Sequence, residues 1–179
     1  MTDSLRLLSL NARSVKGKIV ELQALATNYN IICITETHLD SNFHGAQLFF
    51  LQNKITYRKY RNAHGGGVLI SIDPYLQHTF LDFASDAEVT AIKIHCKHFV
   101  PCVLICCYKP SASNSILPLI EYMHNIRKTH PGHSLILTGA FNLPGINWHN
   151  TVMSTKWSPM YADFVELLAD LDMEQLITN

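Results

Sequence analysis

The chain has 179 residues, enough for one domain with a sizeable hydrophobic core and too few for two ordinary domains. Hydrophobic residues make up 47% of the sequence and charged residues 16%, a composition that excludes an intrinsically disordered chain. Lysine plus arginine and aspartate plus glutamate balance at 14 each, so no overall positive field attracts nucleic acid, and any such binding must come from a local patch.

The first part of the sequence predicts a strand, a helix and a second strand. Residues 5–10 form a short apolar run that ends at Asn11, and Ser14 is expected to cap a helix whose apolar positions recur between residues 19 and 26. Residues 31–34 are a continuous apolar run that leads to Glu36, as in a strand buried on both faces. The chain therefore opens with a β-α-β unit.

The rest of the chain continues this alternation. Strands are predicted at 68–72, directly after three glycines, at 89–95 and at 100–108, and the spacing of apolar residues predicts helices at 116–128 and 161–171. A buried strand at 134–138 separates these helices, and residues 175–177 are expected to begin one more strand. No composition shift marks a linker, so we expect a single α/β (α+β) domain over residues 1–179.

The cysteine spacing and the hydropathy of the sequence limit the cellular compartments in which we expect the protein. The five cysteines lie in or beside apolar runs without a C-x-x-C pair, so we expect buried, reduced thiols and neither a disulfide framework nor a zinc site. No uninterrupted apolar stretch reaches the ~18 residues that a membrane span needs, and the N-terminus lacks the pattern of a secretory signal. We expect a nuclear or cytoplasmic protein that has no membrane partner.

Polar side chains follow the predicted strands at the points where these end. Asn11, Glu36 and Asn142 each come at or just after an apolar strand, and Tyr108 ends a fourth strand. Strand ends that converge on one edge of a layered α/β fold are common ligand sites, because rigid strands hold polar groups there in fixed positions. One glutamate beside two asparagines suits Mg²⁺, which takes one or two carboxylates and keeps most of its waters. Each residue alone is more often structural, as a solvated cap, a turn former or a half-buried aromatic.

Five sequence motifs occur in the order and approximate spacing of one known family. They are L-S-L-N-A-R-S at 8–14, I-C-I-T-E-T-H-L-D at 32–40, G-G-G-V-L-I at 65–70, Y-K-P-S-A-S-N at 108–114 and L-I-L-T-G-A-F-N-L-P-G-I-N-W at 135–148. In these motifs the chain resembles the endonuclease domain of non-LTR (LINE-type) retrotransposons, an apurinic-endonuclease-like branch of the endonuclease/exonuclease/phosphatase superfamily. The resemblance covers essentially the whole chain and implies a four-layer α/β sandwich of the DNase I-like type.

The resemblance also implies a role for each polar residue at the strand ends. Glu36 would be the main metal-binding carboxylate, and Asn11 would line the pocket for metal and phosphate. Tyr108 would position the scissile phosphate, and Asn142 would hold the phosphate or the attacking water. The implied activity is Mg²⁺-dependent nicking of DNA for retrotransposon insertion, in a parent protein with a possible reverse transcriptase domain. Lys109 stands where the family often has arginine and keeps a positive charge for a phosphate.

Two departures from the family pattern predict a pseudoenzyme that is inactive or strongly impaired. Ala140 occupies the position of the aspartate that orients or deprotonates the attacking water in the family, and a methyl group can do neither. A positioned acid or base typically contributes ~100- to 10,000-fold, or roughly 3 to 5 kcal/mol of barrier lowering. The family's last strands and their Ser-Asp-His run have no counterpart before Asn179. We therefore expect a truncated copy whose sandwich is incomplete at its C-terminal end.

Three functional hypotheses are open at this point. An active Mg²⁺-dependent DNA endonuclease explains the motifs but neither departure. A disabled copy or relic fragment that keeps the fold, and with it weak DNA or metal binding, explains both departures. A phosphodiesterase-like branch that acts on phosphoinositides or sphingomyelin is disfavoured by the short loops between the motifs and by the segment at 108–114.

Two further expectations concern the surface. Basic residues from two segments are candidates for contacts with the DNA backbone, although each alone is more often a solvated charge. They are Lys16, Lys18, Arg58, Lys59 and Arg61. Absent terminal strands leave neighbouring strands with unpaired N–H and C=O groups, so we expect self-association through exposed sheet edges.

Overall fold

The computed structural model describes residues 5–40, 51, 53–61, 65–95, 100–113, 115–146 and 159–176. These residues form eight strands and three helices. In chain order they are β1 (Leu7–Asn11), α1 (Ile19–Ala26), β2 (Ile31–Thr35), β3 (Ile55–Lys59), β4 (Val68–Ile72), β5 (His78–Leu81), β6 (Glu88–Ile94), β7 (Cys102–Tyr108), α2 (Leu117–Thr129), β8 (Ser134–Ala140) and α3 (Pro159–Asp170).

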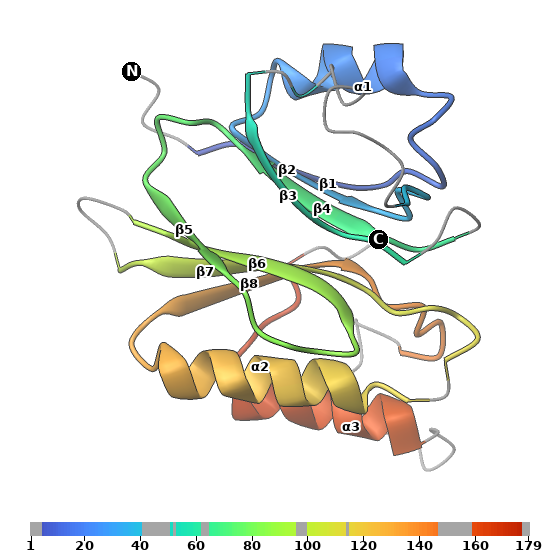
Figure 1. Cartoon of the computed structure of the whole chain (residues 1–179). Helices are drawn as coiled ribbons and strands as arrows, with labels where there is room; N and C mark the ends of the chain where they lie inside the picture. Colours follow the sequence, from blue (N-terminus) through green and yellow to red (C-terminus); the bar gives the residue numbers. More distant parts are fainter. Residues whose placement is uncertain are drawn as a thin grey trace.

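The strands form two mixed sheets that lie face to face. The first has the order β1-β2-β4-β3, with β1 parallel to β2 and the other pairs antiparallel. The second has the order β5-β6-β7-β8, with β7 parallel to β8 and the other pairs antiparallel. Figure 1 shows α1 on the outer face of the first sheet and α2 and α3 on the outer face of the second. The predicted four-layer α/β sandwich is confirmed.

A core of aliphatic side chains and thiols fills the space between the sheets. Alternate residues of the inner strands point into it and are at most 2% exposed: Ile31, Cys33, Val68, Ile70, Ile72, Ile92, Ile94, Leu104 and Cys106. Burial of one such aliphatic side chain contributes about 1.5–3 kcal/mol. Because successive residues of a strand face opposite sides, this list also fixes which later residues of each strand point between the sheets.

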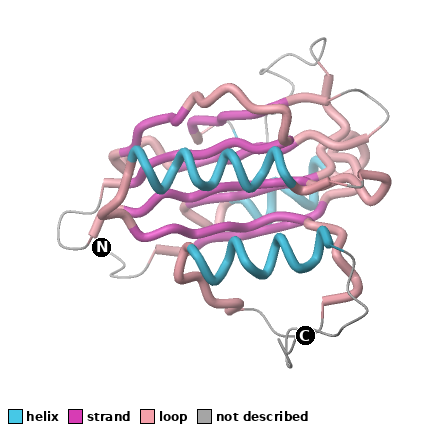
Figure 2. The backbone as a smooth tube through the Cα atoms, turned by 90° about the horizontal axis from the view of Figure 1, so that it is seen from below, coloured by secondary structure: helices cyan, strands magenta, loops and turns pink. Residues whose placement is uncertain are grey.

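The helices cover the outer faces of the sheets. In α2, Leu119, Met123 and Ile126 recur at helical spacing and are buried against the second sheet, and Phe164 and Leu167 of α3 join the same cluster. Figure 2 shows α2 and α3 in front of the sheet, roughly parallel to each other and to the strands. None of the helices in the described ranges is long and apolar enough to cross a lipid bilayer.

Two strands, β3 and β5, are not predicted from the sequence. Their segments, I-T-Y-R-K and H-T-F-L, mix apolar and polar residues without a buried run. Each lies at the edge of its sheet and pairs with a strand that the sequence does predict, β4 or β6. Tertiary pairing therefore decides their conformation more than local preference does.

The predicted cap at Ser14 is wrong. Helix α1 begins at Ile19 with Lys18 at its N-cap position, and no side chain caps it. Ser14 lies in the preceding loop with a φ of +87°, and its hydroxyl accepts a hydrogen bond from the Lys16 N–H at 3.3 Å. The serine stabilises the turn after β1 instead of the helix.

The end of the described chain differs from the expected strand at 175–177. Helix α3 ends at Asp170, and neither Gln175 nor Leu176 is in a strand. The third expected residue, Ile177, lies outside the described residues.

Strand β8 is the last strand of its sheet among the described residues, and Ile136 in its middle is 40% exposed. An unpaired edge with an exposed aliphatic side chain favours pairing with a second copy. We expect sedimentation velocity to show dimers or larger species that increase with protein concentration. Ile136→Lys should shift the population to monomer, because a lysine on an edge strand opposes pairing. A single monomer peak at all concentrations for the unmodified chain would contradict this expectation.

Candidate active site

The residues that end four strands lie at one end of the sandwich. Strands β1 and β2 are parallel, as are β7 and β8, so the carboxyl ends of each pair meet at one edge. The hydroxyls of Ser9 in β1 and Thr138 in β8 are hydrogen-bonded across the two sheets. Asn11 and Ala140 each follow two residues later, on the same faces. The structure thus brings the ends of β1 and β8 together.

Glu36 is held in place by Asn11. The Asn11 amide nitrogen donates a hydrogen bond to Glu36 Oε1 at 2.9 Å, and the Asn11 amide oxygen accepts one from the Arg13 N–H at 3.1 Å. Glu36 has a φ of +51°, which turns the chain sharply at the end of β2. Asn11 therefore fixes the orientation of the carboxylate that the sequence predicts as the metal ligand.

Tyr108 lies beside two carboxylates. Burial raises the pKa of its phenol, and the negative charges of Glu36 and Glu88 and a hydrogen bond to Glu36 raise it further, while Arg61 opposes the shift. The phenol is therefore protonated at neutral pH and acts as a hydrogen-bond donor. The interaction with Glu36 links the end of β7 to the end of β2.

Ala140 stands on the face where a catalytic carboxylate would be useful. It is the register partner of Tyr108 in the parallel pair of β7 and β8, so the two side chains project from the same face of the sheet. Tyr108 packs against the core between the sheets, so this face points toward Asn11 and Glu36. At position 140 this face carries a methyl group, which has no ionisable atom.

Asn142 and Lys109 hold the chain just beyond the strand ends. The Lys109 N–H donates to the Ala140 carbonyl at 2.9 Å, and the Asn142 amide nitrogen donates to the Lys109 carbonyl at 2.6 Å. The Lys109 side chain is buried, and its ammonium group donates to the carbonyls of Pro110 and Ser113 at 3.1 and 2.9 Å. Burial lowers the pKa of this lysine. The charge expected to meet a phosphate instead holds a loop together.

Glu88 is a residue of this region that the sequence does not reveal. It begins β6 and is the register partner of Tyr108. Burial raises the pKa of its carboxyl, although a hydrogen bond from the Gly67 N–H and the charges of Arg61 and Lys59 oppose this. No motif or apolar run marks position 88. Only the pairing of β6 with β7 places it in the site.

Four of the five candidate DNA-contacting residues have partners within the fold. The ammonium groups of Lys18 and Lys59 donate to the carbonyls of Ala12 and Ser85. The guanidinium of Arg58 lies 4.8 Å from the centroid of the Tyr60 ring, and Arg61 pairs with Glu88. Lys16 is exposed. The contact surface thus remains a prediction, with Arg61 the member nearest to Tyr108.

The residues present suit a weakly held divalent cation. Among the described residues, no three or more His, Cys, Asp or Glu side chains gather closely enough to hold a metal ion. Glu36 supplies one oriented carboxylate and the Tyr108 phenol an oxygen beside it, whereas Asn11 turns its amide nitrogen toward Glu36 and its amide oxygen toward the Arg13 N–H. Mg²⁺ tolerates such a set because it keeps several waters and binds substrate phosphates. The donor set therefore fits Mg²⁺ through a single carboxylate.

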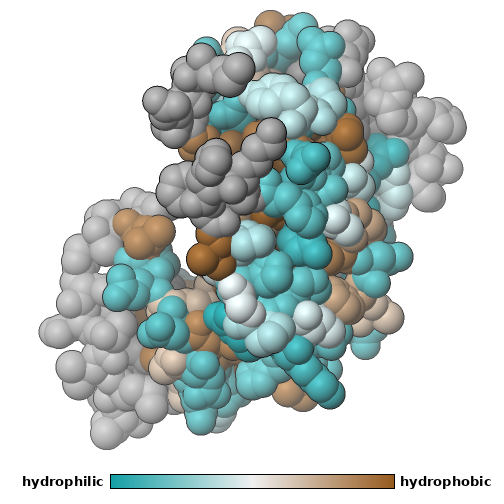
Figure 3. Space-filling view, turned by 90° about the vertical axis from the view of Figure 1, so that its left-hand side faces the viewer, coloured by the Kyte–Doolittle hydropathy of each residue, from teal (hydrophilic) through white to brown (hydrophobic). Residues whose placement is uncertain are grey.

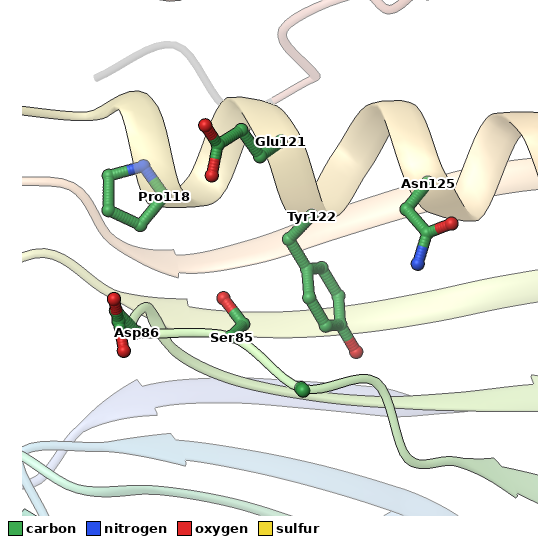
Figure 4. Close-up of a pocket in the computed structure, with 7 residues that line it drawn as sticks. Ser85, Asp86, Pro118, Glu121, Tyr122 and Asn125 are labelled. Atoms are coloured by element: carbon green, nitrogen blue, oxygen red, sulfur yellow. The ribbon is translucent and has the colours of Figure 1, made fainter.

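A separate hollow of about 330 Å³ lies between the loop before β6 and helix α2. Figure 4 shows Asp86 and Ser85 on the loop, facing Tyr122 below the helix, with Glu121 and Asn125 also on α2. Asp86 on the loop and Glu121 on the helix are both acidic, and none of the described residues that line this hollow is basic, which disfavours a phosphate ligand. This hollow is not suited to the chemistry of the strand ends.

Polar groups at the start of β2 and the end of β4 are paired with one another. Lys54 and Asp73 form an ion pair at 2.5 Å, and the Asn30 amide donates to the other Asp73 oxygen at 3.1 Å. Burial alone would raise the pKa of Asp73, but hydrogen bonds from Lys54, Asn30 and Tyr75 lower it overall. We assign the Asp73 network a structural role.

Figure 3 shows the side of the molecule that faces left in Figure 1, where the described side chains are mainly hydrophilic with separate apolar patches.

Three solved structures share this architecture. The endonuclease domain of TRAS1, a telomere-specific non-LTR retrotransposon, has a TM-score of 0.68 and 15% identity, and the match covers 98% of this chain and 74% of that one. The 3′ phosphatase NExo from Neisseria, bound to a product DNA hairpin, has a TM-score of 0.65 and 16% identity over 94% and 71% of the two chains. An AP endonuclease from Archaeoglobus fulgidus has a TM-score of 0.65 and 15% identity over 93% and 70%.

The chain has the DNase I-like fold of these three structures.

The resemblance carried by the five motifs predicts this fold, and the structural likeness confirms it over most of the chain. No protein-family model matches the sequence, and no curated protein matches it. In this fold, the strand ends that carry Asn11, Glu36, Tyr108 and Ala140 lie close together. Their catalytic roles are a separate matter from the fold.

Proposed function

We propose that the chain carries the site of a Mg²⁺-dependent DNA endonuclease that binds a DNA strand but cleaves it slowly or not at all. The observation that supports this most strongly is the placement of Ala140. It shares a face with Tyr108, at the end where Asn11 orients Glu36. A working phosphodiesterase needs a group there that orients or deprotonates water, and alanine has none.

In this proposal, Glu36 holds the cation and Asn11 keeps its carboxylate in position. Bound Mg²⁺ would supply charge stabilisation for the phosphate that is attacked. The Tyr108 phenol would donate a hydrogen bond to a phosphate oxygen, since its raised pKa keeps it protonated at neutral pH. Each of these three residues would contribute to binding and orientation without aspartate at position 140.

Asn142 keeps both a donor and an acceptor for the site. Its amide nitrogen donates one of its two N–H groups to the Lys109 carbonyl at 2.6 Å, which leaves the second N–H and the amide oxygen. The second N–H can donate to a phosphate oxygen, and the amide oxygen can receive a hydrogen bond from an attacking water. We therefore assign Asn142 to the phosphate or the attacking water, and the residue that would deprotonate this water is the one replaced at 140.

DNA is the proposed ligand because the structural neighbours act on it. The TRAS1 domain is an endonuclease of a retrotransposon, and NExo is bound to a DNA hairpin product. The balanced charge of this chain implies that its affinity comes from the local site and is sensitive to salt.

A binding experiment tests the cation site without requiring turnover. Mg²⁺ should strengthen the binding of a short labelled DNA duplex about tenfold, or about 1.4 kcal/mol, when Glu36 is intact. Glu36→Gln should abolish this effect, because the amide has no charge for the cation. Glu166→Gln, an exposed change on α3, is the matched control and should leave the Mg²⁺ effect unchanged. Fluorescence anisotropy with and without Mg²⁺ measures both, and an equal Mg²⁺ effect in Glu36→Gln would refute the assigned cation site.

A further inference from the structure

Arg61 and Glu88 form an ion pair beside Tyr108 that the proposed reaction does not use. The Arg61 Nε lies 3.4 Å from Glu88 Oε1, and the Gly67 N–H donates to the other carboxylate oxygen at 2.7 Å. The Glu88 side chain is 12% exposed and the Arg61 side chain 43%. The carboxylate is thus held within the fold while the guanidinium reaches solvent.

The glycine-rich segment before β4 leaves room for this pair. A Cβ atom on Gly66 would lie 2.2 Å from Glu88 Oε2 and 2.8 Å from Arg61 Cδ. Gly66 also has a φ of +71°, a conformation that residues with a Cβ rarely adopt. The backbone of this segment therefore accommodates both side chains only because position 66 is glycine.

A cavity of about 200 Å³ lies beside the ion pair. Its walls include two acidic residues, Asp86 and Glu88, together with Arg61, Tyr108, Lys109 and Ser113. A guanidinium has five N–H donors, and pairing through Nε leaves the two terminal nitrogens for another acceptor. A carboxylate that fixes the plane of the guanidinium prepares it for the two-point recognition of a phosphate.

We propose that this cavity binds a phosphate group of a nucleic-acid strand, with Arg61 as the contacting residue and Glu88 as the residue that positions it. The proposal rests on the proposed function, and it adds a second phosphate site beside the one at Tyr108. The charge of Lys59, which acts on Glu88, offsets part of the negative charge of the carboxylate.

The salt dependence of DNA binding tests this assignment without turnover. Arg61→Gln is expected to weaken the binding of a labelled duplex about tenfold and to reduce the slope of log K against log salt by about 0.9, the value for one lost phosphate contact. Arg6→Gln is the matched control. Arg6 is exposed and directly precedes the first residue of β1, whereas the site lies at the last residue of that strand, and its replacement removes one positive charge as Arg61→Gln does. It should alter affinity less than about twofold.

Glu88→Gln separates positioning from simple charge. If Glu88 acted only through its charge, its removal would strengthen DNA binding, because a negative group leaves the site. Positioning of Arg61 predicts the opposite, a loss of about threefold, since the guanidinium is no longer fixed. Arg61→Lys keeps the positive charge but lacks the planar fork, and it should also lose about threefold.

The outcomes are distinguishable from failure of the proposed function. Equal affinity and slope for Arg61→Gln and the unmodified chain would overturn the phosphate site and leave the proposed function standing. Tighter binding by Glu88→Gln would overturn the positioning role. If the unmodified chain shows no salt-dependent DNA binding, both the inference and the proposed function fail. Thermal unfolding of each variant identifies any that has lost its fold, and Arg61→Lys then replaces Arg61→Gln.

Discussion

Replacing Ala140 with aspartate is expected to raise the rate of DNA nicking in the presence of Mg²⁺ by about 100- to 10,000-fold. The substitution places a carboxylate beside Tyr108, on the face that points toward Glu36. A positioned base of this kind lowers the barrier by roughly 3 to 5 kcal/mol. Conversion of supercoiled plasmid to open circles over time measures the rate.

The surroundings of residue 140 suit an aspartate that accepts a proton. Glu36 and Glu88 both act on Tyr108 through their negative charges, so a carboxylate beside Tyr108 faces like charges. Like charges raise the pKa of a carboxyl toward neutral pH, which improves it as a general base. Ala140→Asn is the matched control, because it has the size of aspartate without an ionisable group. Equal rates for the Asp and Asn variants would contradict the role of a base.

Gly139→Ala is expected to lower the free energy of unfolding by about 3 kcal/mol or more. A Cβ atom at position 139 would lie 1.8 Å from the carbonyl oxygen of Cys107, and the φ of Gly139 is +138°. Cys107 is the register partner of Gly139 on β7, so relief of the clash would separate two paired strands. Urea unfolding measures the change, provided that the slope against denaturant is unchanged.

Gly132→Ala is the matched control for this substitution. No atom lies within 4 Å of the Cβ that it would add. Its effect on the free energy of unfolding should be within about 0.5 kcal/mol. A similar small effect for Gly139→Ala would show that the backbone at 139 is not constrained as described. Gly139 precedes Ala140 directly, so the constraint also sets the position of Ala140 beside Tyr108.

Most of the fold could be predicted because its inner strands are continuous apolar runs. Strands β2, β4 and β7 are predicted directly from their sequences. They are buried on both faces, which requires the continuous apolar runs that the sequence shows. Edge strands β3 and β5 could not be read, because pairing with β4 and β6 stabilises them more than their own residues do. The sequence predicts Ser14 as a helix cap, but in the structure it stabilises a turn, because a serine hydroxyl can accept a backbone hydrogen bond in either setting.

The site was predictable where a polar residue ends an apolar strand. Asn11, Glu36 and Tyr108 follow this rule, and the structure brings them together. Glu88 does not follow this rule because it begins a strand. It lies beside Tyr108 only because β6 pairs antiparallel with β7. The resemblance gives Lys109 a positive charge for a phosphate, but in the structure its ammonium group donates to loop carbonyls. Register and side-chain direction are tertiary facts that a strand's own sequence does not contain.

The most direct test of the central claim compares DNA affinity with cleavage rate for the unmodified chain and Ala140→Asp. The claim is that the binding frame is intact and that the water-activating carboxylate is what is missing. Single-turnover cleavage and equilibrium binding on one Mg²⁺-containing DNA duplex measure both quantities. We predict affinities within about threefold of each other and a cleavage rate at least about 100-fold higher for Ala140→Asp. Equal cleavage rates for the two proteins, whether both cleave or neither does, would contradict the claim.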